Sequence, residues 1–420
     1  MRVKPSSGRA LASALLISTL LGSVSLTAPA AAQTQIDVIL PMTGPTAGTG
    51  ELFKNGVDFA FSEINDAGGV HGQRVAPRIL DDAGTTQGGT DRVRQAISGG
   101  ARIILQGGGS AVAAAVSADV KRWNERNPDK PVLLIMMGAE AASLTKKDCH
   151  FYAFRTSTNA DMRVKALAKA LSENGRLGTK VFAINQDYSW GREMDQAVKE
   201  NAGVYKYEVV GSVLHDVSKI QDFSPYVERI RESGAETVVT GNWARDLLLL
   251  MQSVASANLK AKFATVFLDE KGNIASAGKA ALGSYVATPF VAEAGGAEGE
   301  AYLKKFNDKT GANPVSAGNN AVIAIRLLGR AMNTVSAGDA TNPTALALTL
   351  ETAKSPWIHG EVSIRAEDHQ LRLPLVVAEV STDAKYKVDG TDMGLKPVKV
   401  LSAAETEVPP DGSCRMQRPK

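Results

Sequence analysis

The sequence predicts an α/β protein with two lobes, each built on a doubly wound parallel sheet. From residue 36 onward, short apolar runs alternate with longer segments in which apolar residues recur at helical spacing. The alternation starts again after Thr156, so two wound sheets follow one another in the chain. Strands separated by single helices form right-handed βαβ units in a parallel sheet. The further helices and strands after the second sheet predict that the chain crosses several times between the lobes.

The first half begins with the apolar run IDVIL at residues 36–40, which has the length and composition of a buried strand. Turn-forming residues fill the loop at 41–50. Apolar residues at helical spacing from Leu52 to Ile64 predict a helix, which Gly68 and Gly69 end. The same two patterns predict a strand at 75–80 leading to Asp81 and Asp82, a helix at 90–98, a strand at 103–105, a helix at 111–126 and a strand at 132–136.

The second half repeats this order of elements without a clear sequence repeat. Its predicted elements are a helix at 161–171, a strand at 181–184, a helix at 191–201, an extended segment at 205–213, a helix at 226–232, a strand at 237–240, a helix at 247–257 and a strand at 263–267. Helices at 298–310, 321–332 and 343–354 and strands at 361–365 and 373–380 complete the prediction.

The first 32 residues have the three parts of a cleavable secretory signal. Arg2, Lys4 and Arg9 form a basic start, an apolar stretch follows, and Ala30-Ala31-Ala32 provides a small-residue cleavage site before Gln33. No cysteine lies near this site, so we expect no lipid anchor there. We expect the mature protein to be exported to the periplasm, with no later segment spanning a membrane.

Charge and length restrict the function of the mature chain. Three of the 47 basic residues and none of the 44 acidic residues lie in the signal, so the mature chain has 44 of each. A chain without net charge gives no reason to expect nucleic acid or an anionic membrane as a partner. Removing 32 of the 420 residues leaves 388, which is more than one core usually holds and again favours two domains.

Cys149 and Cys414 are the only two cysteines, and export places them in an oxidising compartment. Cys414 lies in a polar C-terminal tail that has little means of folding alone. A disulfide would attach this tail to the body of the protein, and the alternative is two independent thiols.

The strand at 103–105 leads through Gly107, Gly108 and Gly109 into an alanine-rich helix that starts at about Ser110. Open α/β sheets bind ligands at such junctions. The first N–H groups of the helix have no partner within it, so a carboxylate could bind there, with the Ser110 hydroxyl as a further donor. Alternatively, the Ser110 hydroxyl only caps its own helix.

Several motifs together resemble the leucine/isoleucine/valine-binding proteins, the periplasmic substrate-binding components of branched-chain amino acid ABC transporters. The resemblance rests on IDVILPMTGPTAGTGELFKNGVDFAFSEINDAGGVHGQ, the following Asp81-Asp82, RIILQGGGSA, GAEAASLT, FRTSTNADM, NQDYSWG and FLDEKG, and extends from about Ile36 to Val380. It implies the type I periplasmic-binding-protein fold, with two lobes joined by three crossings, which we place near Thr156, Thr288 and Gly360. Lobe 1 would then comprise residues 33–156 plus 289–360, lobe 2 residues 157–288 plus 361–400, and the tail residues 401–420.

The resemblance assigns the ligand's carboxylate to the junction at Gly109 and Ser110. Gly138, Ala139 and Glu140 match the next strand-end loop, where the family usually has small residues and threonine. Glu140 departs from that pattern. A carboxylate at this position would repel a ligand carboxylate unless it points away.

Four further positions on other loops, and one pair of neighbours, match the rest of the family's site. Trp243 matches an aromatic residue over the ligand, and Tyr188 and Trp190 match a second aromatic loop. Either Glu270 or its neighbour Asp269 matches the acid that pairs with the ligand's ammonium group. Thr49 stands where the family often has an aromatic residue, which implies a wider mouth. For each aromatic residue alone, core packing is an equal alternative.

The resemblance implies a monomeric periplasmic protein that captures a small ligand, of the branched-chain amino acid type, and delivers it to an inner-membrane ABC permease. The lobes would close over the ligand about a hinge, and no cofactor or metal is expected. Two alternatives keep the same fold: an aromatic acid or amide as the ligand, or a periplasmic ligand sensor instead of a transport component.

The sequence gives little support to catalysis. GGGSA around Ser110 lacks the GxSxG pattern, and it also lacks the GxGxxG spacing of a dinucleotide site. The five histidines have neither triad context nor metal-ligand spacing: His71, His150, His215, His359 and His369. We therefore expect a binding protein and not an enzyme.

Overall fold

The computed structural model describes residues 1–4, 33–216, 219–410 and 412–419. Gln33–Lys420 is a unit of its own, distinct from Met1–Ala32, and the account below concerns it alone. Most of the predicted secretory signal, from residue 5 to residue 32, lies outside the described residues. Within the described ranges no helix is long and apolar enough to cross a membrane.

Five parallel strands form the first sheet, in the order β2-β1-β3-β4-β5. They are β1 (Thr34–Leu40), β2 (Val75–Asp81), β3 (Ile103–Gln106), β4 (Leu133–Met136) and β5 (Ala153–Arg155). The strand order changes direction at β1, because β2 lies on one side of it and β3 on the other. A crevice opens at the carboxyl ends of the strands at such a point, and it is the usual ligand site of open α/β sheets.

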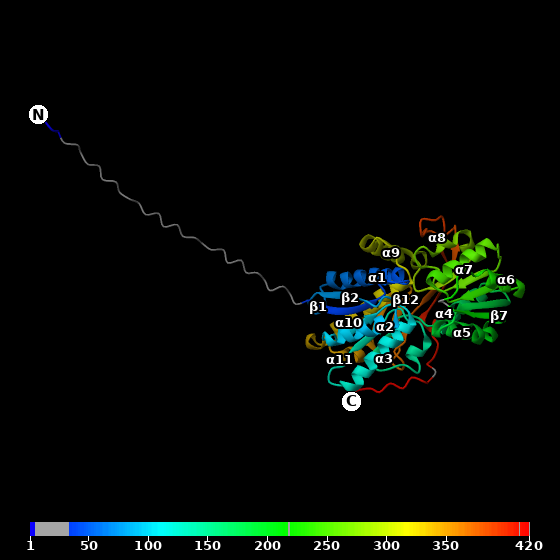
Figure 1. The fold of residues 1–420 in the computed structure, drawn as a ribbon, viewed down its shortest axis with the longest axis horizontal. Helices are drawn as coiled ribbons and strands as arrows, with labels where there is room; N and C mark the ends of the chain where they lie inside the picture. Colours follow the sequence, from blue (N-terminus) through cyan, green and yellow to red (C-terminus); the bar gives the residue numbers. More distant parts are fainter. Residues whose placement is uncertain (5–32, 217–218, 411, 420) are drawn as a thin grey trace. The chain divides into compact units, whose positions relative to one another are not determined.

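Alternating side chains of β1 explain how helices cover both faces of this sheet (Figure 1). Val38 and Leu40 belong to the same buried cluster as apolar residues of α1 (Ala47–Asp66) and α10 (Ser316–Thr334). Ile39 belongs to a separate buried cluster with α2 (Thr86–Ser98) and α3 (Ser110–Arg126). Because successive side chains of a strand point to opposite faces, β1 is buried on both sides.

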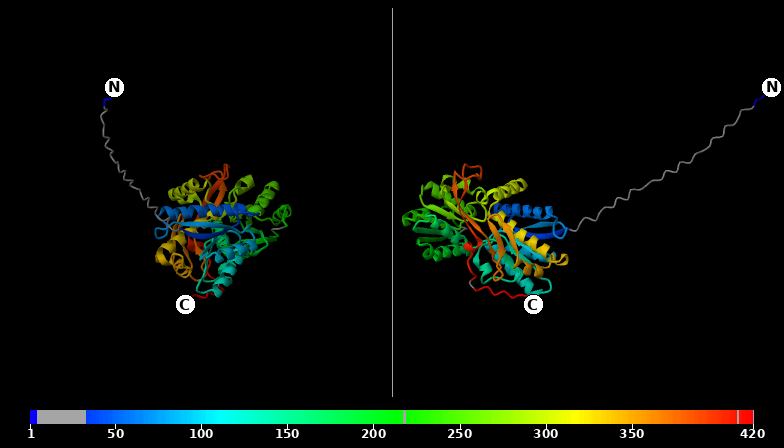
Figure 2. Two further views of the ribbon diagram at one scale, coloured as in Figure 1. Left: turned by 60° about the vertical axis from the view of Figure 1, so that its left-hand side comes forward. Right: turned by 180° about the vertical axis from the view of Figure 1, so that it is seen from behind.

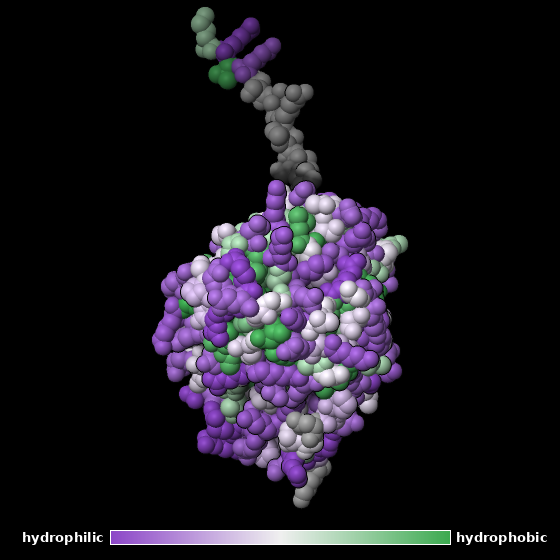
Figure 3. Space-filling model, turned by 90° about the vertical axis from the view of Figure 1, so that its right-hand side faces the viewer, coloured by the Kyte–Doolittle hydropathy of each residue, from purple (hydrophilic) through white to green (hydrophobic). Residues whose placement is uncertain are grey.

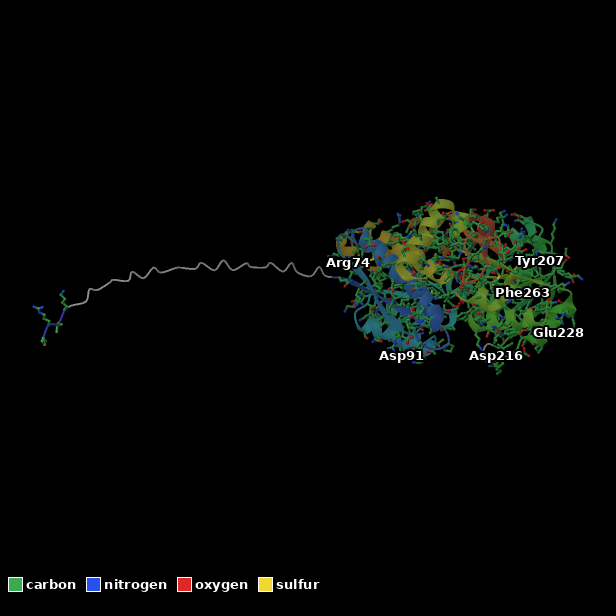
Figure 4. The ribbon with its side chains drawn as sticks, turned by 90° about the horizontal axis from the view of Figure 1, so that it is seen from above. Arg74, Asp91, Tyr207, Asp216, Glu228 and Phe263 are labelled. Carbon is green, nitrogen blue, oxygen red and sulfur yellow. A yellow bond between two sulfur atoms is a disulfide. The ribbon has the colours of Figure 1, made fainter. Side chains whose placement is uncertain are left out.

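Seven strands form the second sheet, in the order β15-β14-β10-β9-β8-β6-β7. Five of them are parallel: β6 (Lys180–Gln186), β7 (Glu208–His215), β8 (Thr237–Thr240), β9 (Lys262–Thr265) and β10 (Tyr285–Thr288). The helices of this half are α4 (Ala160–Glu173), α5 (Ser189–Tyr205), α6 (Ser224–Ser233), α7 (Ala244–Ser256) and the short α8 (Asn273–Ala277). In Figure 4, Tyr207, Glu228 and Phe263 mark this half, while Arg74 and Asp91 mark the half that holds the first sheet.

The α/β fold with two wound sheets is confirmed, with one addition to the second sheet. β14 (Leu375–Ser381) and β15 (Gly394–Leu401) run antiparallel at its edge, so the sheet is mixed. A small antiparallel sheet, not predicted, joins β11 (Lys354–Trp357), β12 (Gly360–Ile364) and β13 (Leu371–Arg372). Parallel βαβ units need long crossovers, whereas these late strands follow one another through shorter connections and pair antiparallel.

The structure changes the bounds of predicted elements and adds a strand. The helix predicted at 343–354 ends at Leu350, since α11 is Pro343–Leu350 and Lys354 already begins β11. The extended segment predicted from 205 begins only at Glu208, after Lys206 ends α5 in the left-handed conformation. β15 is a strand that the sequence analysis did not identify, and it ends at Leu401, one residue into the predicted tail.

The chain leaves the first sheet after β5, returns from the second sheet after β10 through α9 (Gly296–Thr310) to α10, and crosses again before β14 (Figure 2). Thr156 and Thr288 lie directly after β5 and β10, and Gly360 begins β12. That these three segments act as a hinge between the lobes stays a prediction.

A disulfide between Cys149 and Cys414 attaches the C-terminal tail, with the two Cα atoms 5.6 Å apart. Polar contacts hold the tail at other points as well. Lys165 Nζ donates to the Glu407 carbonyl at 2.6 Å, and Arg365 donates to the Val408 carbonyl at 2.7 Å. Figure 1 shows the resulting C-terminal segment, in red, running back to the part of the molecule that contains α3.

We expect the double variant Cys149→Ser/Cys414→Ser to lose about 2–4 kcal/mol of unfolding free energy, because the disulfide restricts the unfolded chain between the two cysteines. Urea denaturation measures this loss. Wild-type protein with reductant should lose the same amount, while the double variant should not respond to reductant. Equal denaturation midpoints for wild type and variant would contradict a stabilising role.

Candidate functional site

A cavity of about 40 Å³ lies at the carboxyl ends of the strands, between the two sheets. Its wall comes from the N-terminal halves of α1, α3, α5 and α10 and from the loops after β3, β4, β6, β8 and β9. The lining residues are Thr49, Phe53, Gly108, Gly109, Ser110, Gly138, Glu140, Tyr188, Trp190, Trp243, Phe267, Glu270, Ser316, Ala317 and Asn320. Nine of the eleven residues that the sequence analysis selected for a ligand are among them.

Ala139 and Asp269 were also selected, and the cavity wall contains neither. Ala139 has no exposed surface, packs in the cluster of α2 and α3, and its carbonyl accepts a hydrogen bond from Ser157 Oγ at 2.9 Å. The Ala139 side chain thus lies in the core, and a contact between this residue and a ligand stays a prediction. Its side chain points into the core because neighbouring residues of an extended segment face opposite ways.

The junction before α3 is arranged to receive an anion. Gly109 is the N-cap residue of α3, and no side chain caps this helix. The Ser110 hydroxyl instead accepts a hydrogen bond from the Ala141 N–H at 3.1 Å, so the alternative that Ser110 only caps its own helix is wrong. This leaves the hydroxyl proton free to be donated toward the cavity. Together with the first N–H groups of α3, it provides donors for a carboxylate.

Close packing explains Gly138 beside this junction, while Gly109 faces Trp243 at an ordinary contact distance. A Cβ atom on Gly138 would lie 2.4 Å from the Phe53 ring and 2.8 Å from the Gly108 nitrogen, so a larger residue does not fit. A Cβ atom on Gly109 would lie 3.8 Å from the Trp243 ring. The indole of Trp243 thus reaches across from the second sheet to the N-terminus of α3.

Glu140 is turned toward a cation that the sequence analysis did not select. Arg163, on α4, donates from Nη2 and Nε to the two Glu140 oxygens at 2.8 and 3.2 Å. It also donates to Thr158 Oγ1 at 2.6 Å and to the Ala287 carbonyl, and its side chain is fully buried. A bidentate guanidinium satisfies the carboxylate, so the expected repulsion of a ligand carboxylate by Glu140 is largely offset.

The neighbours Asp269 and Glu270 have different surroundings. Asp269 Oδ2 accepts hydrogen bonds from Ser316 N at 3.0 Å, Ser316 Oγ at 2.7 Å and Thr288 Oγ1 at 2.9 Å. Glu270 lines the cavity, and among the described residues its carboxylate has no hydrogen-bond donor. Asp269 therefore holds the start of α10, while Glu270 is left for a ligand.

The pKa of Glu270 is raised to about 8, mainly by burial and also by the nearby Asp269 and Glu140 carboxylates, while Arg163 acts in the opposite direction. Two carboxylates line the cavity, and one guanidinium stands behind them. The site is thus short of positive charge. An ammonium group placed beside Glu270 would supply it.

Aromatic side chains form the wall on the side of the second sheet. Trp243 Nε1 donates to the Tyr188 hydroxyl at 2.8 Å, and Trp190 Nε1 donates to the Gly241 carbonyl at 2.8 Å. The ring centroids of Trp190 and Phe267 are 5.7 Å apart. Trp190 is 2% exposed, so most of its surface belongs to the core and only part of it reaches the cavity.

Six lining residues were missed by the sequence analysis: Phe53, Gly108, Phe267, Ser316, Ala317 and Asn320. Phe53 was placed in the predicted helix from Leu52 to Ile64 and judged only as a helix-forming position. Ser316, Ala317 and Asn320 precede the helix predicted at 321–332, whereas α10 begins at Ser316. Phe267 is the first residue of the motif FLDEKG and was included only as a strand residue. Arg163 could have been noticed only from its position, because it directly follows the motif FRTSTNADM in a helix that begins within that motif.

Comparison with known proteins agrees with this geometry. Residues 33–385 match the family model described as periplasmic binding protein. The chain belongs to the periplasmic binding protein family. It is 44% identical over 386 residues to the Leu/Ile/Val-binding protein homolog 4 of Brucella melitensis biotype 1, covering 92% of this chain and 93% of that protein. It is 31% identical over 230 residues to the Leu/Ile/Val-binding protein BraC3 of Rhizobium johnstonii, covering 54% of this chain and 59% of that protein.

Solved structures of this family superpose well. The closed conformation of a leucine-, isoleucine-, valine-, threonine- and alanine-binding protein from Brucella ovis is similar with a TM-score of 0.89 and 44% identity, over 93% of this chain and 100% of that one. A solute-binding protein from Rhodopseudomonas palustris BisB5 in complex with 3,4-dihydroxybenzoic acid shares the fold at 20% identity, with a TM-score of 0.75 over 88% of this chain and 98% of that one. As a member of this family, the chain is a periplasmic solute-binding component of a transport system.

The raised pKa of Glu270 makes the stability of the ligand-free protein depend on pH. The folded pKa of about 8 lies above that of an unfolded chain, so the folded state holds this proton more tightly. The resulting stability is fully present below pH ~4 and is lost as the pH rises through about 8. We expect Glu270→Gln to raise the melting temperature at pH 8 by at least about 2–4 °C and to leave it nearly unchanged at pH 4.

Scanning calorimetry of the ligand-free protein at the two pH values tests this expectation. Glu298→Gln, on the exposed surface of α9, is the matched control and should change neither value. A variant that melts below wild type at pH 8 would show that the Glu270 carboxylate is stabilised by the fold.

Proposed function

We propose that this protein captures a small neutral L-amino acid between two lobes and presents it to an inner-membrane ABC permease. One observation carries the proposal: the cavity pairs an anion cradle at Ser110 with the unpartnered carboxylate of Glu270. A zwitterion placed between them would have both charges met, which makes its burial tolerable.

The charges in the cavity favour an amino acid over an aromatic acid. An aromatic acid offers one carboxylate and no cation, so it would leave Glu270 unpaired and bring a further negative charge beside it. The Rhodopseudomonas palustris protein with 3,4-dihydroxybenzoic acid shares the fold at 20% identity and does not bear on this choice.

Cavity size and relatives favour a short side chain. The cavity volume of about 40 Å³ and the aromatic wall suit an aliphatic group of a few carbon atoms. The relatives from Brucella and Rhizobium are named as Leu/Ile/Val-binding proteins, and the Brucella ovis structure as a protein binding leucine, isoleucine, valine, threonine and alanine.

We propose residues 33–156 plus 289–360 as lobe 1 and residues 157–288 plus 361–400 as lobe 2. Two carboxylates of lobe 2 then form a clasp across the cleft. Glu193, on α5, accepts hydrogen bonds from Ala142 N at 2.5 Å and Ser143 N at 3.3 Å, while Asp269 accepts those of Ser316. A hinge opening would break these contacts, so they stabilise the closed form that a permease would recognise.

The proposal includes export of the mature chain from Gln33, a monomeric state and no catalytic activity. On the face shown in Figure 3, apolar side chains form small separate patches within a mostly hydrophilic surface. Such a face suits a monomer that meets its permease transiently. A ligand sensor would have the same cleft, and a failure of the reconstituted permease to take up a tightly bound ligand would favour that alternative.

A thermal-shift screen, followed by calorimetric titration, tests the ligand class. Small neutral L-amino acids should raise the melting temperature by mass action, whereas benzoate and 4-hydroxybenzoate should not. Glu270→Gln should weaken amino acid binding at least about tenfold, because an ammonium group loses its partner. Tight binding of a benzoate with unchanged affinity in Glu270→Gln would overturn the proposal.

The clasp predicts a second effect at a residue outside the cavity. Glu193→Ala should weaken binding about tenfold, because two charge-assisted hydrogen bonds of the closed form are lost. Gln196→Ala, on the exposed face of the same helix, is the control. Titration gives the affinity, and small-angle scattering should show that ligand closes the variant less completely. Affinity within twofold of wild type would exclude the clasp.

A further inference from the structure

Asn320 contributes an amide to the cavity wall that the chain itself does not use. It lies on α10, one turn after Ser316, and its side chain lines the cavity although only 3% of the residue is exposed. Residues four apart lie on the same face of a helix, which brings both side chains to the cavity.

The Asn320 Oδ1 atom is buried and has no hydrogen-bond partner among the described residues. Its neighbour Asn319 makes the contrast clear, since Asn319 Oδ1 accepts a hydrogen bond from the Tyr302 hydroxyl at 2.7 Å and lies away from the cavity. Leaving a buried amide oxygen unpaired is unfavourable, because the oxygen has lost its hydrogen bonds to water. A ligand group that donates to Asn320 would remove this cost.

The positions of the two charge anchors indicate which part of the ligand this group belongs to. The α-carboxylate is assigned to Ser110 and the α-ammonium to Glu270, so the ligand's side chain must face the remaining wall. On the side of the first sheet that wall consists of Thr49, Phe53, Ser316, Ala317 and Asn320. Phe53 and Ala317 are apolar, the Ser316 hydroxyl donates to Asp269, and Asn320 has the buried acceptor without a partner. Such a wall matches a short side chain carrying one polar group.

We infer that Asn320 is a specificity-determining residue that makes the protein prefer a short, hydroxyl-bearing amino acid side chain over the hydrocarbon side chain of the same shape. This inference deepens the proposed function and rests on it. The amide can both donate and accept a hydrogen bond, so it can pair with a hydroxyl in either orientation. The small cavity volume of about 40 Å³ favours a short side chain.

Isosteric ligands provide the test. L-Threonine and L-allo-threonine each replace one methyl group of L-valine by a hydroxyl group, and together they offer the hydroxyl at both positions. Calorimetric titration should show that wild-type protein binds one of the two at least about tenfold more tightly than valine. Asn320→Leu keeps the size of the side chain and removes its polar atoms, and it should abolish or reverse that preference.

Matched variants separate specificity from folding. Asn319→Leu makes the same chemical change on the adjacent residue and should lower the melting temperature while leaving the preference unchanged. Asn320→Ala should also lose the preference, if Asn320→Leu is too unstable to titrate. The readout is a ratio of affinities within one variant, so a uniform loss of folded protein does not alter it.

The outcomes are distinct. Valine bound as tightly as both hydroxyl isosteres by wild type overturns the inference and leaves the proposed function intact. An equal loss of affinity for all three in Asn320→Leu also overturns it, since Asn320 would then serve the ammonium group that they share. No binding of any amino acid, with Glu270→Gln equally inactive, overturns the proposed function and the inference with it.

Discussion

The buried guanidinium of Arg163 is the interaction on which the charge balance of the site depends. Three carboxylates lie around it, those of Glu140, Asp269 and Glu270, and it forms an ion pair with the first of them. A buried ion pair gains little net stability over apolar packing, but removing one partner leaves an uncompensated charge and is costly. Arg163 therefore allows the loop after β4 to carry an acid at the edge of a ligand cavity.

The same guanidinium links the parts of the molecule that a hinge would move. Arg163 lies on α4, beyond the proposed crossing at Thr156. Its guanidinium donates to Glu140 after β4 and to the backbone of β10. Residues of the first and second sheets thus share one hydrogen-bonded centre. If the lobes move about a hinge, a change in the position of Arg163 would alter both its ion pair with Glu140 and its contact with β10.

The adjacent acids Asp269 and Glu270, in the loop after β9, point to different surroundings. Asp269 points toward the start of α10, where three donors satisfy one of its oxygens, and Glu270 points into the cavity. One acid serves the fold and the other is left for the ligand. Burial of the Glu270 carboxyl group without a hydrogen-bond donor disfavours its charged form, so the ligand-free protein loses stability as the pH rises through about 8.

The sequence by itself determined the α/β class and the order of most elements, because apolar periodicity is a local signal. It favoured the disulfide between Cys149 and Cys414, and the junction at Ser110 with the family resemblance pointed to nine of the cavity residues. Only the tertiary structure placed Glu270 and not Asp269 in the cavity wall, showed that Arg163 holds Glu140, left Ala139 out of the wall and brought in Asn320 from α10. These outcomes depend on which side chains meet across hundreds of residues and in which direction each one points. Such contacts arise only when two sheets and their helices pack together, so no local pattern records them.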